Sequence, residues 1–425
     1  MKIELIEPLS KKKKAWRRVP LTPTSILQIA GLTPPEIELS ITDEKYDQVD
    51  FDKKVDLVGI SARTTCVSRA YEIADEYRKR GVKVVLGGMH PTILPDEAIQ
   101  HADAVVVGEA ENVWHNVIKD AQNDSLRSFY QSDDYSDMKG LPYPRRDLLD
   151  QNRYTEVYSL QFSRGCPYKC NFCTVSRFYG GKYRFRPVED VISEIKQVDT
   201  KYIFFIDDNI AGNQRYAKEL LNAIIPLKKK WVGQITITAA KNKDFVKLMA
   251  DSGCISIFVG FESLSEQSLK ESSKNHNKIE HYEKAIANLQ NHGIFPVAAF
   301  VFGFDNDDKY IFEKTADFGY KNKVGFMNFN ILTPYPGTDL YHELNKENRL
   351  HSKDWWLNND WSDVLYEPKL MTSDELLNGC NLLHKEFSRY SSLARRFVFP
   401  DHNMMIYWFL YLRFNLSARK MIKDY

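Results

Sequence analysis

The sequence predicts an α/β protein with a doubly wound N-terminal domain, a partial (β/α)6 barrel and a helical C-terminal region. Short apolar segments alternate with amphipathic ones over the first 125 residues, and the alternation resumes after residue 155, as in parallel sheets whose strands are joined by helices. The stretch between them is polar and irregular, and the end of the chain is helical and aromatic. We therefore divide the chain into a first domain (1–125), a linker (126–155), a barrel (156–340) and a C-terminal domain (341–425).

The first domain begins with a strand and continues in strand–helix alternation. Proline follows the helix expected at 21–35, and the amphipathic helix at 68–81 ends at Gly81 after basic residues, as helix C-termini commonly do. The expected strands are short and apolar, and several run directly into glycine: 2–7, 36–44, 56–61, 82–88 and 102–109.

The barrel shows six further apolar segments with helical patterns between them. In a barrel of this kind the chemistry lies at the carboxyl ends of the strands. The expected strands are 157–163, 202–207, 234–240, 255–262, 295–303 and 325–332.

Composition excludes several classes of protein. The chain has 425 residues, and 58 Lys plus Arg balance 57 Asp plus Glu, so its overall charge makes no case for nucleic-acid binding. Six cysteines in this length do not form a disulfide scaffold. The start lacks the apolar core of a signal peptide, and no apolar run reaches the roughly 18 residues of a membrane span. A cytoplasmic protein is the expectation.

Three cysteines gather in "SRGCPYKCNFC", where Cys166, Cys170 and Cys173 are spaced C-x3-C-x2-C directly after the first barrel strand. Thiolates at this density suit zinc or an iron–sulfur cluster. Structural zinc sites take four ligands, whereas the remaining cysteines stand isolated in the sequence. A [4Fe–4S] cluster held by three thiolates would leave one iron open.

The triad resembles the hallmark of the radical S-adenosylmethionine (SAM) superfamily. The resemblance implies that the three thiolates bind three irons and that SAM chelates the fourth. Reductive cleavage of SAM would then give a 5′-deoxyadenosyl radical. Phe172 matches the superfamily's aromatic position near the adenine.

Polar residues at later strand ends follow the same resemblance. It implies a SAM site built from Asp207, Asp208 and Asn209, from Glu262 and Ser263, and from Lys274. Turn formation at strand ends is the alternative for the first three, and plain solvation is the alternative for Lys274.

The strand ends of the first domain carry "GISARTT", "LGGMHPT" and "VVGEAE", which would line a ligand crevice at the carboxyl edge of the sheet. This arrangement resembles the Rossmann-like B12-binding domain found in front of many radical SAM enzymes. It implies cobalamin contacts from hydroxyls, from small residues that leave room for the nucleotide tail, and from one acid: Ser61, Thr64, Thr65, Gly87, Gly88, Gly108 and Glu109.

No histidine stands in a D-x-H-x-x-G motif, so we expect cobalamin without a lower histidine ligand from that motif. His90 precedes a proline and is expected to bond the loop rather than cobalt. The basic run 11–18 is expected to be a solvated loop rather than a phosphate clamp.

The C-terminal segment "DWWLNNDWSDVLYEPKLMTSDELLNG" resembles the branch that includes hopanoid methylases and related lipid-modifying enzymes. Trp355, Trp356 and Trp361 would pack in the core, cap the barrel mouth or pack on an apolar substrate. Residues 403–423 would form either a core-packed terminal helix or an amphipathic segment on a membrane surface.

The resemblance implies a cobalamin-dependent radical SAM methyltransferase acting on an unactivated carbon of a small-molecule or lipid-like substrate, with a flavodoxin- or ferredoxin-type electron donor. One alternative is radical chemistry without methylation: ring formation, oxidation or C–C coupling, with cobalamin redox-active, structural or absent. Another is a cobalamin- or metal-sensing module without turnover. A methylthiotransferase is disfavoured because Cys66 alone lies in the first domain.

Overall fold

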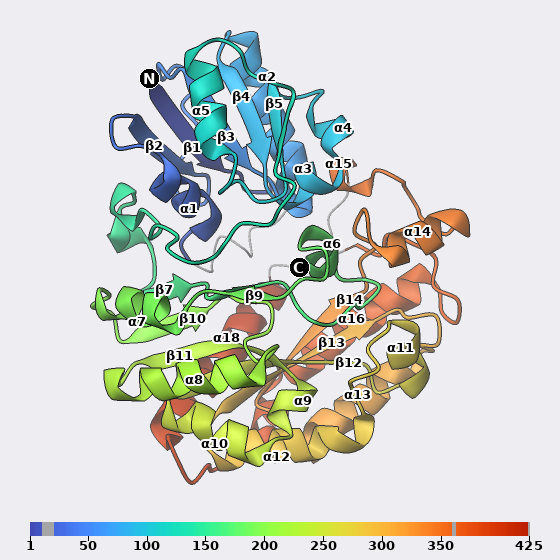
Figure 1. Ribbon diagram of the computed structural model, residues 1–425. Helices are drawn as coiled ribbons and strands as arrows, with labels where there is room; N and C mark the ends of the chain where they lie inside the picture. The colour runs from blue at the N-terminus through green and yellow to red at the C-terminus, as the bar shows by residue number, and fades with distance from the viewer. Residues whose placement is uncertain (11–20, 359–362, 424–425) are drawn as a thin grey trace.

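The computed structural model describes residues 1–10, 21–358 and 363–423, and it arranges them as an upper domain above a larger barrel (Figure 1). The basic run 11–18 and Trp361, on which we placed expectations, lie outside these residues.

The N-terminal domain is built on a six-stranded sheet whose paired strands are all parallel. The strand order is β2-β1-β3-β4-β5-β6, so the chain reverses direction across the sheet between β1 and β3. Ligands of open parallel sheets bind at such a reversal, beside the carboxyl ends of the strands. The strands are β1 Lys2–Glu7, β2 Glu38–Asp43, β3 Leu57–Ser61, β4 Lys83–Gly87, β5 Ala104–Val107 and β6 Phe129–Gln131.

Helices cover both faces of this sheet, as predicted for a doubly wound domain. Helices α1 (Thr24–Leu32) and α5 (Trp114–Gln122) share one apolar core with the strands, whereas α2 (Val67–Lys79) packs into a second core on the opposite face. Both cores consist of apolar side chains that alternate along the buried strands. The short helices are η2 (Thr64–Cys66), α3 (Met89–Ile93) and α4 (Pro95–Ala98).

The segment predicted as a linker holds one strand of the first sheet. Strand β6 pairs with β5 and buries Tyr130 between two exposed neighbours. Three residues are too few for an alternation to be recognised in a sequence, which explains why the prediction ended the domain before this strand. The remainder of this segment contains the short 3-10 turns Arg146–Leu148 and Gln151–Arg153.

The barrel is a second parallel sheet of six strands, ordered β14-β13-β12-β11-β10-β7, with helices outside it (Figure 1). Two predicted strands had wrong bounds. The strand predicted at 157–163 already ends at Leu160, and the strand predicted at 234–240 lies four residues earlier because α9 begins directly after Thr236. The strands are β7 Val157–Leu160, β10 Tyr202–Phe205, β11 Lys230–Thr236, β12 Cys254–Glu262, β13 Phe295–Phe302 and β14 Phe326–Ile331. The helices between the strands are α7 Val188–Lys196, α8 Gln214–Ile224, α9 Ile237–Ala240, α10 Lys243–Asp251, α11 Glu266–Glu271, α12 Tyr282–Asn291 and α13 Tyr310–Lys321, with 3-10 turns at Ile225–Leu227 and Ile279–His281.

The C-terminal region is helical, as predicted. Its elements are α14 Asp339–Lys346, α15 Trp355–Asn358, α16 Ser373–Phe387, α17 Tyr390–Arg396 and α18 Met404–Lys423. Among the described residues, none of the helices combines the length and the hydropathy needed to cross a bilayer.

Helix α15 ties the C-terminal region to the first domain through a buried polar cluster. Trp356 Nε1 donates to Glu97, and Glu97 Oε1 also lies 3.0 Å from His90 Nε2. The other ring nitrogen of His90 lies 3.2 Å from Thr64 Oγ1. Both nitrogens of this fully buried histidine are therefore engaged inside the protein, and both Trp355 and Trp356 pack in the core.

Candidate functional site

The cysteine triad lies on the loop between the two-residue strand β8 (Ser163–Arg164) and helix α6 (Thr174–Phe178). Gly165 opens the loop with a φ of +88°, a left-handed conformation that favours glycine. Strand β8 pairs with β9 (Arg184–Phe185), so the loop is closed at its base. The three thiols are free and half-buried.

Burial makes these thiols poor acids. It raises the pKa of Cys166 and Cys170, and it raises the pKa of Cys173 to about 12. A bound metal would have to stabilise the thiolates. Among the described residues no three His, Cys, Asp or Glu converge on one point for a single ion, and the ligands of an iron–sulfur cluster need not, because each binds a different iron. The donor set fits such a cluster.

The strand end of β10 holds this loop in place. Asp207 is fully buried, and its Oδ1 accepts hydrogen bonds from the backbone and hydroxyl of Ser163 and from the Phe162 N–H. Its Oδ2 is buried without a hydrogen-bond partner, and burial raises its pKa to about 7. Asn209 Nδ2 lies 3.9 Å from Cys166 Sγ. Asp207 therefore orders the loop, and Asn209 contacts a candidate ligand.

Asp208 lies beside the same loop. Burial raises its pKa to about 6, although the Gly165 backbone N–H donates to its carboxylate and lowers the pKa.

Glu262 and Lys274 form a buried ion pair at the end of β12. Glu262 has a φ of +67° at an irregularity in the pairing of β12 with β13, a backbone conformation that is costly for a residue with a side chain. Burial alone would lower the pKa of Lys274, but Glu262, Cys170 and Cys173 together raise it. This pair lies within electrostatic reach of the triad.

Ser263 and Phe172 complete the residues predicted to bind SAM. Ser263 is buried, and its hydroxyl accepts from the Ser265 N–H at 3.1 Å, so it also shapes the turn after β12. Phe172 packs partly buried against Phe304, with ring centroids 6.0 Å apart.

A cavity lies where the N-terminal domain meets the barrel. Its walls come from the carboxyl edge of the first sheet, from α1, from the segment 126–155 that was predicted as a linker, and from the barrel segment that carries the triad. It lies beside the carboxyl ends of the strands, where open parallel sheets bind their ligands.

Five of the seven residues predicted to contact cobalamin line this cavity: Ser61, Gly87, Gly88, Gly108 and Glu109. A Cβ atom on Gly108 would meet nothing within 4 Å, so the chain leaves space there. Thr64 and Thr65 are not among the lining residues. Thr64 lies in the η2 turn, and its hydroxyl is 3.2 Å from His90 Nδ1.

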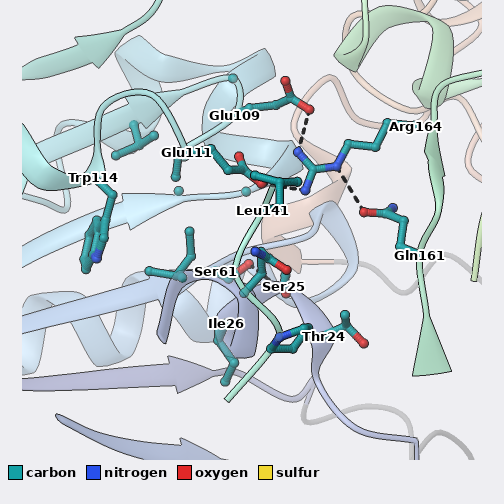
Figure 2. Close-up of a pocket in the computed structure, with 18 of the residues that line it drawn as sticks. Thr24, Ser25, Ile26, Ser61, Glu109, Glu111, Trp114, Leu141, Gln161 and Arg164 are labelled. Atoms are coloured by element: carbon teal, nitrogen blue, oxygen red, sulfur yellow. Dashed lines mark hydrogen bonds and ion pairs between the residues drawn. The ribbon is translucent and has the colours of Figure 1, made fainter. Parts of the chain in front are cut away.

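Arg164 is the principal residue that the sequence analysis missed. Figure 2 shows its guanidinium between Glu109 and Gln161 at the cavity wall. Its Nη1 lies 2.7 Å from Glu109 Oε1, and its Nη2 lies 2.5 Å from Glu111 Oε1. Arg184 Nη2 also lies 2.9 Å from Glu109 Oε1. The acids belong to the first domain and the arginines flank the cysteine loop, so this cluster joins the two sites.

Other lining residues lie outside the motifs singled out in the sequence. Among them are Thr24, Ser25, Trp114, Met138, Leu141 and Tyr179. No pattern in the sequence distinguished them, although the paired acids of "GEAE" could have suggested a cationic partner.

Comparison with known proteins assigns a family to each of the two domains. Residues 160–319 match the model of the radical SAM superfamily, and residues 28–118 match that of the B12 binding domain. Bacteriochlorophyllide d C-12(1)-methyltransferase of Chlorobaculum tepidum is 30% identical over 415 residues, which cover 95% of this chain and 90% of that protein. The chain belongs to the cobalamin-dependent radical SAM methyltransferase family.

Two further relatives of this radical SAM enzyme act on different molecules. Bacteriochlorophyllide d C-8(2)-methyltransferase of the same organism is 32% identical over 378 residues, 83% of each chain. Hopanoid C-2 methylase of Rhodopseudomonas palustris is 27% identical over 346 residues, 78% of this chain and 65% of that protein. The predicted likeness to hopanoid methylases is thus confirmed, within a family that also includes tetrapyrrole methyltransferases.

A solved structure has the same fold. The cobalamin-dependent radical SAM enzyme OxsB, with aqua-cobalamin and SAM bound, superposes with a TM-score of 0.72 at 14% identity, over 99% of this chain and 72% of that one. The predicted fold class is confirmed. The cofactors that the two domains imply are a [4Fe–4S] cluster, SAM and cobalamin.

Proposed function

We propose that this radical SAM enzyme methylates an unactivated carbon of a small, largely apolar substrate of the lipid or tetrapyrrole class. The observation that carries the proposal is the shared wall between the two sites. Arg164 and Tyr179 line the cavity between the two domains. Arg164 lies just before the segment that holds the triad, and Tyr179 lies just after it. Methylation at one carbon requires the radical source and the methyl donor to reach the same substrate.

In this proposal Cys166, Cys170 and Cys173 bind three irons of the cluster. Phe172, Asp208, Asn209, Glu262, Ser263 and Lys274 surround SAM, while Asp207 orders the loop. Ser61, Gly87, Gly88, Gly108 and Glu109 line the cobalamin site. When bound, the cluster and SAM supply a 5′-deoxyadenosyl radical, and cobalamin supplies the methyl group.

The chain's own residues have positioning roles. The buried pair Glu262–Lys274 presents a fixed charge pair beside the cysteines without needing water. The cluster of Glu109, Glu111, Arg164 and Arg184 fixes the spacing between the cavity and the loop. A fixed spacing between two reaction partners lowers the entropic cost of their encounter.

An acidic one-electron carrier of the flavodoxin or ferredoxin type is the proposed electron donor. Residues 157–188 contain no Asp or Glu, and Lys169 and Lys182 are exposed within this stretch. A Cβ on Gly181 would lie 3.3 Å from Lys169 Cε, so Lys169 packs beside the residue preceding Lys182. Positive charge around the triad would attract such a carrier.

The reducing cytoplasm, where such carriers act, is the proposed location. A peripheral membrane contact through the C-terminal segment is also part of the proposal.

Anaerobic reconstitution with iron, sulfide, cobalamin and SAM tests the chemistry. In the presence of reductant and substrate we expect 5′-deoxyadenosine together with S-adenosylhomocysteine. Deoxyadenosine without S-adenosylhomocysteine would refute methyl transfer and leave radical chemistry without methylation. Cobalamin binding with no SAM cleavage would instead favour a sensing module.

The substrate class has its own test. Lipid and pigment extracts from a strain lacking the gene are compared with those from its parent by mass spectrometry. We expect at least one species of low polarity to lose one methyl group in the deletion strain. Methyl loss confined to polar peptides would refute the apolar substrate.

A further inference from the structure

Helix α18 is apolar on two sides. One side is buried: Tyr407, Tyr411, Asn415 and Ala418 are each at most 8% exposed. Tyr411 OH donates to Leu393 O at 2.6 Å, and Asn415 Nδ2 donates to Gly325 O at 3.0 Å. These buried contacts hold the helix on the protein.

The buried side packs on the barrel sheet. Tyr407 and Phe414 contact Phe295 at the start of β13, and Phe414 also contacts Phe258 and Phe326. Residues adjacent to these in the strands, such as Ile257 and Met327, face the core under the outer helices. Because neighbouring strand residues point to opposite faces, α18 covers the inner face of the partial barrel.

The other side of α18 is a stripe of exposed apolar residues. Met405 is 82% exposed, Phe409 66%, Leu412 49% and Leu416 38%. Their spacing of four, three and four residues places them within about 60° of one another around an α-helix. We call these four residues the α18 stripe. Exposed Phe399 packs edge-to-face with Trp408, with ring centroids 5.3 Å apart, and extends the apolar surface at the helix start.

The charged residues of α18 itself have one sign. Residues 402–423 contain no Asp or Glu, while Arg413, Arg419, Lys420 and Lys423 are basic. Arg413 and Lys420 are exposed and follow the stripe residues Leu412 and Leu416 by one and four positions, and the Arg419 guanidinium lies 4.0 Å from the ring centre of Tyr390. Exposed Asp401 precedes the helix. The face is therefore apolar along its centre and cationic along the border where Arg413 and Lys420 lie.

We propose that the α18 stripe docks on the surface of an anionic lipid bilayer. The stripe spans about 17 Å along the helix, too short to cross a bilayer and suited to lying in its interface. Apolar side chains would enter the acyl boundary, and the bordering cations would contact lipid phosphates. The proposal concerns this face and does not rest on the reaction proposed above, although an enzyme held there would meet apolar substrates directly.

A second copy of the chain is the competing occupant, because the same spacing suits a helix pair. Cations border the stripe, so two stripes in contact would bring like charges together. The bilayer satisfies both the apolar centre and the cationic border.

Vesicle sedimentation tests the proposal with the full-length protein. We expect binding to phosphatidylcholine vesicles containing a quarter phosphatidylglycerol, with at least ten-fold weaker binding to pure phosphatidylcholine. The variant Met405→Gln/Phe409→Gln/Leu412→Gln should lose at least ten-fold in binding to the anionic vesicles. Raising the salt concentration should weaken binding of the parent protein.

A matched control changes equally exposed apolar residues elsewhere. Tyr310→Gln/Leu370→Gln/Leu382→Gln alters residues that are 63%, 58% and 64% exposed, and it should bind vesicles like the parent. Far-ultraviolet circular dichroism checks that both variants are folded. Equal vesicle binding by the stripe variant and the parent would overturn the proposal, as would no binding by the parent. A parent dimer that the stripe variant converts to monomer in sedimentation equilibrium would assign the stripe to self-association instead.

Discussion

Arg164 Nη1 lies 2.7 Å from Glu109 Oε1, and this buried ion pair joins the segment that carries the cysteine triad to the strand end of the first domain. Glu111 and Arg184 extend the pair to two acids and two arginines. Burial alone would raise the pKa of Glu109, but Arg184 and Arg164 together hold it below its usual value. Ion pairs between buried side chains thus link the two domains. Each of these charges would destabilise the protein if it were buried without its partner.

Replacing Arg164 with Met should destabilise the protein strongly. It would leave Glu111 and part of Glu109 buried without a counter-charge, which typically costs about 3–5 kcal/mol, and Arg184 would offset some of this for Glu109. Denaturant titration followed by tryptophan fluorescence measures the midpoint. Arg80→Met, which breaks exposed pairs with Glu76 and Asp52, should leave the midpoint nearly unchanged. Equal midpoints for the two variants would contradict the role of the buried cluster.

Substituting any cysteine of the triad should prevent assembly of a normal cluster. Cys170→Ala removes one of three thiolates, and we expect loss of the visible iron–sulfur absorption or, at least, of SAM cleavage. Cys254→Ala is the matched control, because Cys254 is fully buried at the start of β12 and away from the loop. Retained SAM cleavage in the Cys170 variant would refute the assignment of the triad.

Much of this architecture was predictable because it is periodic. The alternation of apolar strands and amphipathic helices reports burial directly, so all six barrel strands were located even where their ends were misplaced at Leu160 and Thr236. The triad was predictable because its ligands are local in sequence. Strand β6 was missed because three residues carry no period.

The contacts between domains were not predictable, for a physical reason. Arg164 and Glu109 are 55 residues apart, and their pairing depends on how two separately folded sheets dock. The direction of the Thr64 hydroxyl likewise depends on a 3-10 turn and on the position of His90. Residue type and spacing alone do not contain this information.

A large side chain in place of Gly87 should weaken cobalamin binding, because Gly87 lines the cavity between the two domains. Gly87 has no left-handed φ, and a Cβ there would meet only Val106 Cβ at an ordinary 3.6 Å, so a side chain is tolerated by the backbone. Gly87→Leu should reduce cobalamin affinity about ten-fold or more by occupying the cavity, whereas Gly87→Ala should reduce it far less. Spectrophotometric titration with hydroxocobalamin measures both. Equal affinities for the Leu variant and the parent would place the cofactor elsewhere.

The buried carboxyl of Asp207 should make stability depend on pH. Burial raises its pKa from 3.8 to about 7, so the folded protein holds this proton more tightly than the unfolded chain does. That contribution is complete below about pH 4 and is lost as the pH rises towards 7, at no more than about 1.4 kcal/mol per pH unit. Asp207→Asn should flatten the fall, leaving the smaller slope from Asp208, whose pKa burial also raises.

Thermal denaturation of the apoprotein between roughly pH 4.5 and 7 measures that slope, because this range lies between the unfolded and folded pKa values of Asp207. Asp251→Asn, an exposed change in α10, is the control and should keep the slope of the parent. A parent protein whose stability rises through this range would contradict the raised pKa.

Reversing the charge of Lys169 and Lys182 should impair delivery of electrons by an acidic protein. Both lysines are exposed beside the triad in a stretch without acids, so Lys169→Glu/Lys182→Glu would repel an acidic carrier. We expect reduced flavodoxin to drive SAM cleavage about ten-fold more slowly in this variant. Cleavage driven by dithionite, which needs no protein docking, should be unchanged.

The control Lys196→Glu/Lys201→Glu makes the same charge change at exposed positions before β10, at the opposite end of the barrel strands, and should keep the flavodoxin rate. Equal flavodoxin-driven rates in the two variants would remove this surface as the docking site, whereas a failure with dithionite would point to the cluster itself.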